Sequence, residues 1–167
     1  ADTAPDDDDD VILPAPTDAN YTVTAASAAI SVKSLTIGTA GSTSGLTATF
    51  NSNTLGTHLV AEDLVVETGG VMTHAEILNS KTALGSENAR LIFSVGGDMV
   101  VNGSINVSGR GFKAKAGPGT HGNYEYSASH GGSGGDLNGS RCYGSLTQPI
   151  YAGSGAGNAG SAGGGAV

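Results

Sequence analysis

The sequence predicts an all-β fold, a solenoid of short stacked strands that is continued by a glycine-rich, loop-dominated region. Apolar and polar residues alternate with a period of two in several short segments, which is the pattern of half-buried strands. Glycine, at 28 of 167 residues, interrupts these segments at short intervals. Aromatic residues make up only 5% and Trp is absent, so thin layers of Val, Ile and Leu are expected in place of one thick core.

Residues 1–20 are predicted to form an acidic arm. They hold seven of the 15 acidic residues, including the run Asp6, Asp7, Asp8, Asp9 and Asp10, and no Lys or Arg. The like charges favour an extended chain, and the prolines of this segment exclude a helix. The apolar triplet Val11, Ile12 and Leu13 follows the run and is expected to dock as a strand on a sheet edge.

Residues 21–108 are predicted to form the strands of the solenoid. Apolar residues, many of them β-branched, alternate there in six segments, 35–37, 46–50, 64–66, 91–95, 99–101 and 105–107. Residues 61–71 and 95–105 are similar, because each contains an acidic residue, a strand, a glycine turn and a second apolar strand, which predicts successive sides of a coil. Residues 73–84 come nearest to a helix and are interpreted as a short helix or a loop excursion.

Residues 109–167 form the glycine-rich region, which holds most of the glycines of the chain. Such a composition is typical of flexible or disordered segments. Interleaved tyrosines and the turn-like sequence Gly117-Pro118-Gly119 instead favour packed loops in which backbones approach closely. We therefore expect an ordered but irregular region that packs on the solenoid or continues it.

Charge, hydropathy and cysteine content exclude several classes of protein. Beyond residue 20, eight acidic residues face seven basic ones, so no basic patch is available for nucleic acid. No apolar run approaches the ~20 residues of a transmembrane helix. The first residues, Ala1-Asp2-Thr3, suit a mature N-terminus after signal removal, so a secreted protein is expected. The only cysteine, Cys142, excludes an internal disulfide framework, and a small buried residue is favoured over an intermolecular bridge or a free thiol.

Several short segments of the strand region and of the glycine-rich region form a pattern when they are taken together. They are residues 34–38, 63–66, 69–73 and 97–105 in the strand region, and 107–112, 117–119, 130–135, 143–145 and 163–167 in the glycine-rich region. The chain thus resembles the glycine-rich β-solenoid segments of large secreted surface and adhesin-like proteins. The resemblance implies a right-handed parallel β-helix and an extracellular, structural or adhesive role, and it implies no chemistry.

Two catalytic motifs occur in glycine-rich tracts and are rejected on mechanism. Residues 155–160 match the dinucleotide fingerprint GxGxxG, but neither a preceding strand nor a following helix is predicted. Residues 131–135 match the nucleophile-elbow pattern GxSxG, but no histidine follows His130 to complete a triad. The acidic residues beyond the arm are scattered, whereas glycoside cleavage needs two carboxyl groups at a set separation. The sequence therefore predicts no catalytic site.

Candidate metal and modification sites remain. Adjacent carboxylates such as Asp6 to Asp10 suit Ca²⁺, although a solvated, repulsive segment is the alternative reading of this run. His121, His130 and Cys142 fit no compact zinc spacing, and His58 and His74 are interpreted as ordinary surface residues. Four sequons predict glycosylation if the chain passes through a compartment that modifies them, at Asn20, Asn102, Asn106 and Asn138.

The predicted function is structural. We expect a subunit of a filament, sheath or surface matrix, with no transmembrane segment, whose partners are copies of itself in a homopolymer and, as a further candidate, surface polysaccharide. Val11, Ile12 and Leu13 would be donated to the neighbouring subunit as an added strand. One alternative is an adhesive or carbohydrate-binding module, which would gather Tyr124, Tyr126, Tyr143 and Tyr151 in one exposed patch. A polysaccharide-degrading enzyme is a remote alternative. An ice-binding face is also remote, because Thr residues are plentiful but form no regular Thr-x-Thr ladder.

Overall fold

A computed structural model describes residues 4–25, 28–78, 87–120, 130, 142–145, 147–148, 150–156 and 161–167. These residues contain eleven strands of two to five residues and no helix. The chain divides into two compact units. Unit 1 consists of Ala1–Thr73 and Leu91–Asn106, and unit 2 consists of His74–Arg90 and Val107–Val167.

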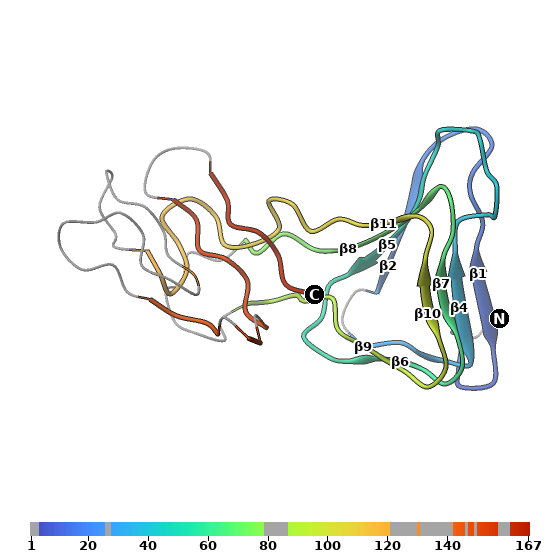
Figure 1. Ribbon diagram of the computed structural model, residues 1–167, viewed down its shortest axis with the longest axis horizontal. Coiled ribbons are helices and arrows are strands. Elements are labelled where there is room, and N and C mark those ends of the chain that lie inside the picture. Colours follow the sequence, from blue (N-terminus) through green and yellow to red (C-terminus); the bar gives the residue numbers. More distant parts are fainter. Residues whose placement is uncertain are drawn as a thin grey trace. The chain divides into compact units, whose positions relative to one another are not determined.

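Three parallel sheets make up the strand structure, and each takes every third strand of the chain (Figure 1). Sheet A has the order β1 (Asp10–Leu13), β4 (Ser34–Ile37), β7 (Leu64–Val66) and β10 (Met99–Val101). Sheet B has the order β2 (Tyr21–Ala25), β5 (Ala48–Ser52), β8 (Gly70–His74) and β11 (Ser104–Ile105). Sheet C has the order β3 (Ser31–Val32), β6 (His58–Val60) and β9 (Phe93–Val95).

The predicted right-handed parallel β-helix, or solenoid, is wrong as a description of the fold. The described strands are short and lie in three parallel sheets, and no right-handed β-helix is shown. The physical reason is that period-2 alternation determines which residues of a strand face inward. It contains no information on how the strands are distributed among sheets or on the hand of their connections. The part of residues 73–84 that is described, 73–78, is not helical.

Alternation explains the interior of sheet A. Parallel pairing in register places like residues above one another, in rows that cross the strands. Two inner rows result, the first through Val11, Leu35, Leu64 and Met99 and the second through Leu13, Ile37, Val66 and Val101. The members on β4 and β7 are buried. The residues between them in each strand point to the opposite face, so the outer face of the sheet carries the remaining rows.

Sheets B and C share an aromatic cluster in the interior of unit 1. Phe50 of β5 lies edge-on to His58 of β6, with ring centroids 5.3 Å apart, and to Phe93 of β9, at 5.7 Å. His58 and Phe93 are register partners, and their ring centroids are 4.8 Å apart. Edge-on aromatic pairs at such distances add to the stability gained from burial. A chain with few aromatic residues therefore concentrates two of them between these two sheets.

One glycine shows why the connections between strands can lie so close. Gly38 directly follows β4 and has φ +92°, which a residue with a side chain rarely adopts. A Cβ at this position would lie 2.6 Å from both Glu67 O and Gly70 N. The connection after β4 thus lies against the one after β7, and only glycine fits there.

The described part of unit 2 consists mainly of loops around a small core. Its described core residues are Ile77, Phe112, Ala116, Ala152 and Ala166, and Ile77 and Phe112 form an isolated parallel bridge. Backbone hydrogen bonds hold three of its segments together: Gly111 N–H donates to Gly163 O (2.7 Å), and Gly153 N–H donates to Gly164 O (2.8 Å). Small residues at these positions let the backbones approach closely.

Candidate assembly surfaces

Sheet A ends in two open edges, β1 and β10. Gly38 N–H donates to Leu13 O (2.8 Å), so the backbone of Leu13 faces β4. Alternate residues of a parallel strand bond to opposite neighbours, so the N–H and C=O of Ile12 face outward. At the other edge, Asn102 N–H donates to Val66 O (2.7 Å), which leaves the backbone of Val101 facing away from β7. Both edges can accept another parallel strand.

Apolar side chains gather at these edges. All three residues of β10 are partly exposed, Met99 by 45%, Val100 by 41% and Val101 by 44%. On β1, Ile12 is 65% exposed. Met99 and Val101 end the inner rows whose members on β4 and β7 are buried, so they are exposed because no further strand of unit 1 covers them. The edges therefore expose side chains of a type that is buried elsewhere in the same rows.

An apolar cavity of about 140 Å³ lies at the β1 end of unit 1. Its lining is almost wholly hydrophobic and comes mainly from the first strand of each sheet, β1, β2 and β3, with one residue each from β4 and β5. Val11, Leu13 and Leu35 of the inner rows take part, together with Phe50 of β5 and Pro5 of the arm. The interior of unit 1 is thus incompletely filled at this end.

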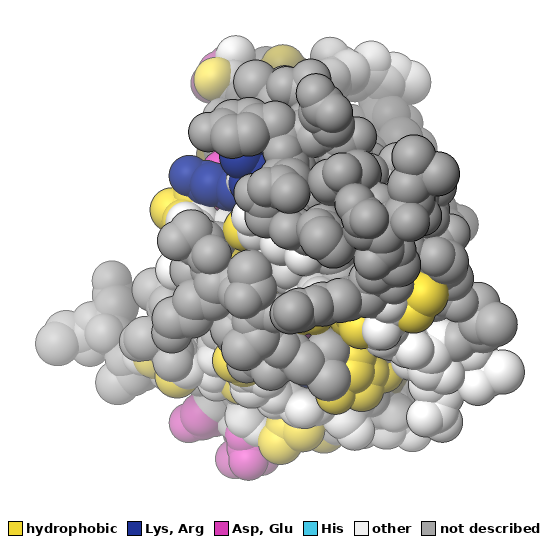
Figure 2. All heavy atoms as spheres, turned by 90° about the vertical axis from the view of Figure 1, so that its left-hand side faces the viewer, with side chains coloured by type: hydrophobic (Ala, Val, Ile, Leu, Met, Phe, Trp, Pro, Cys, Tyr) yellow, Lys and Arg dark blue, Asp and Glu magenta, His cyan; other side chains and the backbone are white. Residues whose placement is uncertain are grey.

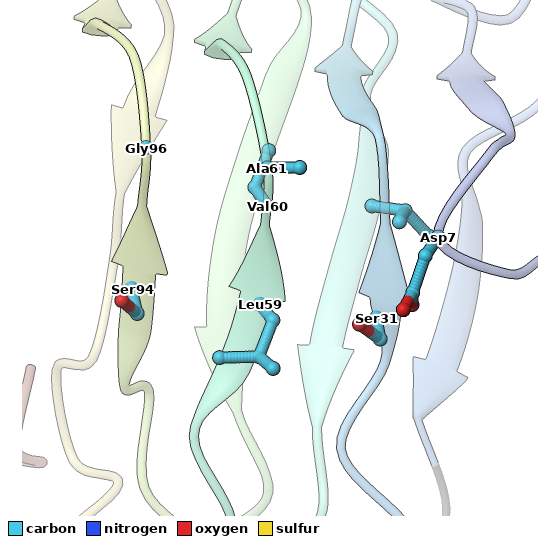
Figure 3. A pocket seen from close by; sticks show the side chains of 8 residues that line it. Asp7, Ser31, Leu59, Val60, Ala61, Ser94 and Gly96 are labelled. Atoms are coloured by element: carbon cyan, nitrogen blue, oxygen red, sulfur yellow. The ribbon is translucent and has the colours of Figure 1, made fainter.

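A shallow groove of about 320 Å³ crosses the outer face of sheet C (Figure 3). Ser31, Leu59 and Ser94 form one row across β3, β6 and β9, and Leu59 is largely exposed between the two hydroxyl groups. Asp7 of the arm borders the groove beside β3 (Figure 3). The lining has no aromatic ring and one carboxylate, so it offers a contact surface and no pair of groups for acid–base chemistry.

The Asp run does not converge on one point. Asp6 to Asp9 form a turn, and Asp10 belongs to β1. Asp10 accepts hydrogen bonds from Ser34 Oγ (2.6 Å) and Lys33 Nζ (3.2 Å), and these two bonds lower its pKa. Within the described residues, no three His, Cys, Asp or Glu side chains are placed to hold a metal ion. Calcium binding by the run stays a prediction.

The predicted assembly triplet forms most of β1. Val11, Ile12 and Leu13 pair in parallel with Leu35, Thr36 and Ile37 of the same chain. The strand therefore docks on a sheet edge within its own subunit, and its donation to a neighbour stays a prediction.

Three of the four sequons lie in the described part of the chain, and Asn138 lies outside it. Asn20, Asn102 and Asn106 are all exposed. Two of them use their amides in hydrogen bonds: Asn20 Oδ1 accepts from Thr47 N–H (2.8 Å), and Asn102 Nδ2 donates to Glu67 Oε2 (3.0 Å). Glycosylation at these sites stays a prediction.

The expectation that His58 and His74 are ordinary surface residues is wrong, since both side chains are fully buried. Ile30 N–H donates to His58 Nδ1 (3.1 Å), so Nε2 carries the ring proton and donates to Ser52 Oγ (2.8 Å). No described histidine appears on the molecular face drawn in Figure 2. The missed signal is alternation: His58 and Val60 share a face of β6, as do Met72 and His74 of β8.

His74 has the opposite arrangement in unit 2. Ala166 N–H donates to its Nε2 (3.2 Å), and its Nδ1–H donates to Ala75 O (2.8 Å). Each of the two buried rings accepts a backbone N–H, so each is held neutral. Burial lowers the pKa of both histidines.

The described tyrosines of unit 2 are engaged within the unit. Tyr143 donates its hydroxyl hydrogen to Ala152 O (2.6 Å), and burial raises its pKa. The guanidinium carbon of Arg90 lies 5.1 Å from the ring centroid of Tyr151. Tyr124 and Tyr126, the other members of the predicted patch, lie outside the described residues, as does His121.

Cys142 is exposed, so the favoured expectation of a small buried residue is wrong. His130 packs edge-on against Tyr143, with ring centroids 4.9 Å apart. Residues 131–135 and 157–160 lie outside the described residues, and with them most of the two glycine motifs.

Comparison of the chain with protein-family models, with curated proteins and with solved structures finds no match. Among the described residues, no helix is long and apolar enough to cross a membrane.

Proposed function

We propose that this protein is an extracellular structural subunit that joins copies of itself end to end through the open edges of unit 1, in a filament, sheath or surface matrix. One observation carries the proposal. Among the described residues, the same parallel sheet ends at β1 and at β10 in backbone groups that no further strand pairs with and in exposed apolar side chains. The extracellular location is supported by the resemblance of the sequence to secreted surface proteins.

The two edges are complementary in direction, and in phase except after Leu13, where Pro14 has no N–H to donate to Val101 O. A second copy in the same orientation brings its β1 beside β10 as another parallel strand. The register repeated along sheet A then places Val11 of that copy beside Met99, and Leu13 beside Val101. Both inner rows continue across the joint. Such a contact uses two different surfaces, so it repeats from copy to copy and generates a filament when the rotation between copies does not close a ring.

Burial of the row ends supplies the driving force. Full burial of one Val, Leu or Met side chain is worth about 1.5–3 kcal/mol, and these side chains are already half-buried. Association costs about 4–15 kcal/mol, because the joining copies lose translational and rotational freedom. Sheet A alone is therefore marginal, and the end strands of sheet B, β2 and β11, must contribute to a stable joint.

The joint is tested by placing a charge in an inner row. Val101→Asp buries a carboxylate at the joint, and we expect the protein concentration required for half-maximal joining to rise more than about tenfold, which corresponds to about 1.4 kcal/mol. Sedimentation velocity measures the size distribution, and negative-stain microscopy shows whether the particles are linear.

The matched control is Val100→Thr. Val100 is as exposed as Val101 but belongs to the outer row, where Thr36 occupies the corresponding place on β4. We expect this variant to join like the original protein. An original protein that stays monomeric at every concentration in both low and high salt, or a Val101→Asp variant that joins normally, contradicts the proposed function.

A further inference from the structure

We propose that residues 5–10, here called the acidic cap, cover one end of unit 1 and restrain the joining of copies by electrostatic repulsion. This inference rests on the proposed function, since it concerns the regulation of the same joint. The partner that the cap holds back is the β10 end of a second copy.

The acidic cap has a defined structure. Asp9 N–H donates to Asp6 O (3.0 Å), and Asp6 N–H donates to Asp9 Oδ2 (3.0 Å), which closes a turn. Asp8 N–H donates to Asp6 Oδ1 (3.1 Å) inside it. The carboxylates of Asp6 and Asp9 are thus used to build the turn. Asp7 and Asp8 are exposed, and their carboxylates have no hydrogen-bond partner among the described residues.

The cap lies at the end where the joint forms. Lys33 N–H donates to Asp9 O (3.0 Å), which fixes the turn beside the segment between β3 and β4. Asp7 borders the groove next to Ser31 of β3, and Pro5 lines the apolar cavity at the same end. β3 is the end strand of sheet C and the cap lies along its outer side, so the cap is the part of this end that faces β9 of a second copy.

The cap and the incoming β10 end both carry negative charge, so they repel each other. The row that begins at Asp10 and Ser34 continues past the strand ends through Asp63, which directly precedes β7, to Asp98, which directly precedes β10. Asp63 Oδ1 accepts the backbone N–H of Asp98 (2.9 Å), whereas the Asp98 carboxylate itself is exposed. Joining in the register given above brings Asp98 beside Asp10 and the cap. Like charges directly opposite each other across strands are destabilising.

Only a small part of this charge is balanced within the chain. Lys33 pairs with Asp10 at 3.2 Å, and it is the only ion-pair partner of the cap among the described residues. Charged residues on an edge are a known means of preventing unwanted strand pairing. An acidic end cap therefore explains why five consecutive Asp residues precede an apolar edge strand.

The test removes two cap charges and keeps the turn. Asp7→Asn combined with Asp8→Asn leaves the turn-forming carboxylates of Asp6 and Asp9 intact. The matched control removes two exposed acidic groups elsewhere, by Asp18→Asn with Glu76→Gln. Sedimentation velocity gives the concentration for half-maximal joining at about 0.01 M and about 1 M NaCl, where the Debye length is about 30 Å and about 3 Å.

We expect the original protein and the control to join about tenfold more readily in high salt than in low salt. We expect the cap variant to join in low salt more readily than the original protein and the control do, because Asp7 and Asp8 no longer repel the incoming edge, and to gain less from high salt. A cap variant that behaves like the original protein, or a control that changes as much as the cap variant, overturns the cap and leaves the proposed function standing. Failure of every protein to join in either salt overturns the proposed function and the cap with it.

Discussion

At the scale of single residues, the buried histidines are the most informative groups in the chain. His58 connects β6 to Ile30, which precedes β3, and to Ser52 of β5, so one ring ties sheets B and C together. Within unit 2, the ring of His74 accepts the backbone N–H of Ala166 and so fixes that segment beside β8. A protonated ring would present a hydrogen to a backbone N–H in either place, so both bonds require the neutral ring.

This arrangement predicts that the protein loses stability in mild acid. The folded-state pKa of each histidine lies below that of the unfolded chain, which is about 6.5. The unfolded chain then binds protons first, so the free energy of unfolding falls as the pH drops below about 6.5. Asp10, whose pKa is lowered from 3.8, loses its contribution only in stronger acid. Urea unfolding between about pH 7.5 and about pH 5 measures the effect.

The control for this prediction is His58→Gln. Glutamine offers a neutral acceptor and a neutral donor but does not titrate in this range. We expect lower stability at neutral pH and a smaller loss between the two pH values than in the original protein. An original protein with the same free energy of unfolding at both pH values shows that these rings are not the acid-sensitive groups.

At the scale of elements, local alternation was a reliable guide to strands. The segments 35–37, 64–66 and 99–101 were predicted from two-residue periodicity and coincide with most or all of β4, β7 and β10. Their assignment to one sheet depends on pairing between residues about 30 positions apart, which no local pattern encodes. The same limit applies to the candidate surfaces: the exposed apolar residues are visible in the sequence, but their position at the end of a sheet is not.

The connection after β4 gives a test at this scale. Gly38→Ala introduces a Cβ 2.6 Å from two backbone atoms at a φ of +92°, and we expect it to lower the free energy of unfolding by about 2 kcal/mol or more. Gly41→Ala is the matched control, because Gly41 has φ +69° but nothing within 4 Å of the added Cβ. It carries the backbone strain alone, about 1 kcal/mol. Urea unfolding compares them, and equal losses would show that the close approach at Gly38 is unimportant.

At the scale of the whole molecule, the chain builds two cores by different means. Unit 1 stacks apolar rows across parallel strands, whereas unit 2 surrounds Phe112 with alanines and closely approaching glycine backbones. Composition predicted an irregular glycine-rich segment. It did not predict which side chains form its core, because Phe112, Ala152 and Ala166 are distant in sequence and only packing unites them.

Because the two units have separate cores, a core substitution in unit 2 should reduce the protection of amides from hydrogen exchange in unit 2 alone. Phe112→Ala removes the largest described side chain of the unit 2 core, and a buried Phe→Ala change costs about 3–5 kcal/mol. We expect amide hydrogen exchange to speed up in residues 107–120 and 161–167, which bond to one another around Phe112. The amides of β4 and β7 depend on the inner rows of sheet A and should keep their protection. Equal loss of protection in both units would show that they unfold as one cooperative body, in which the strand stack has no stability of its own.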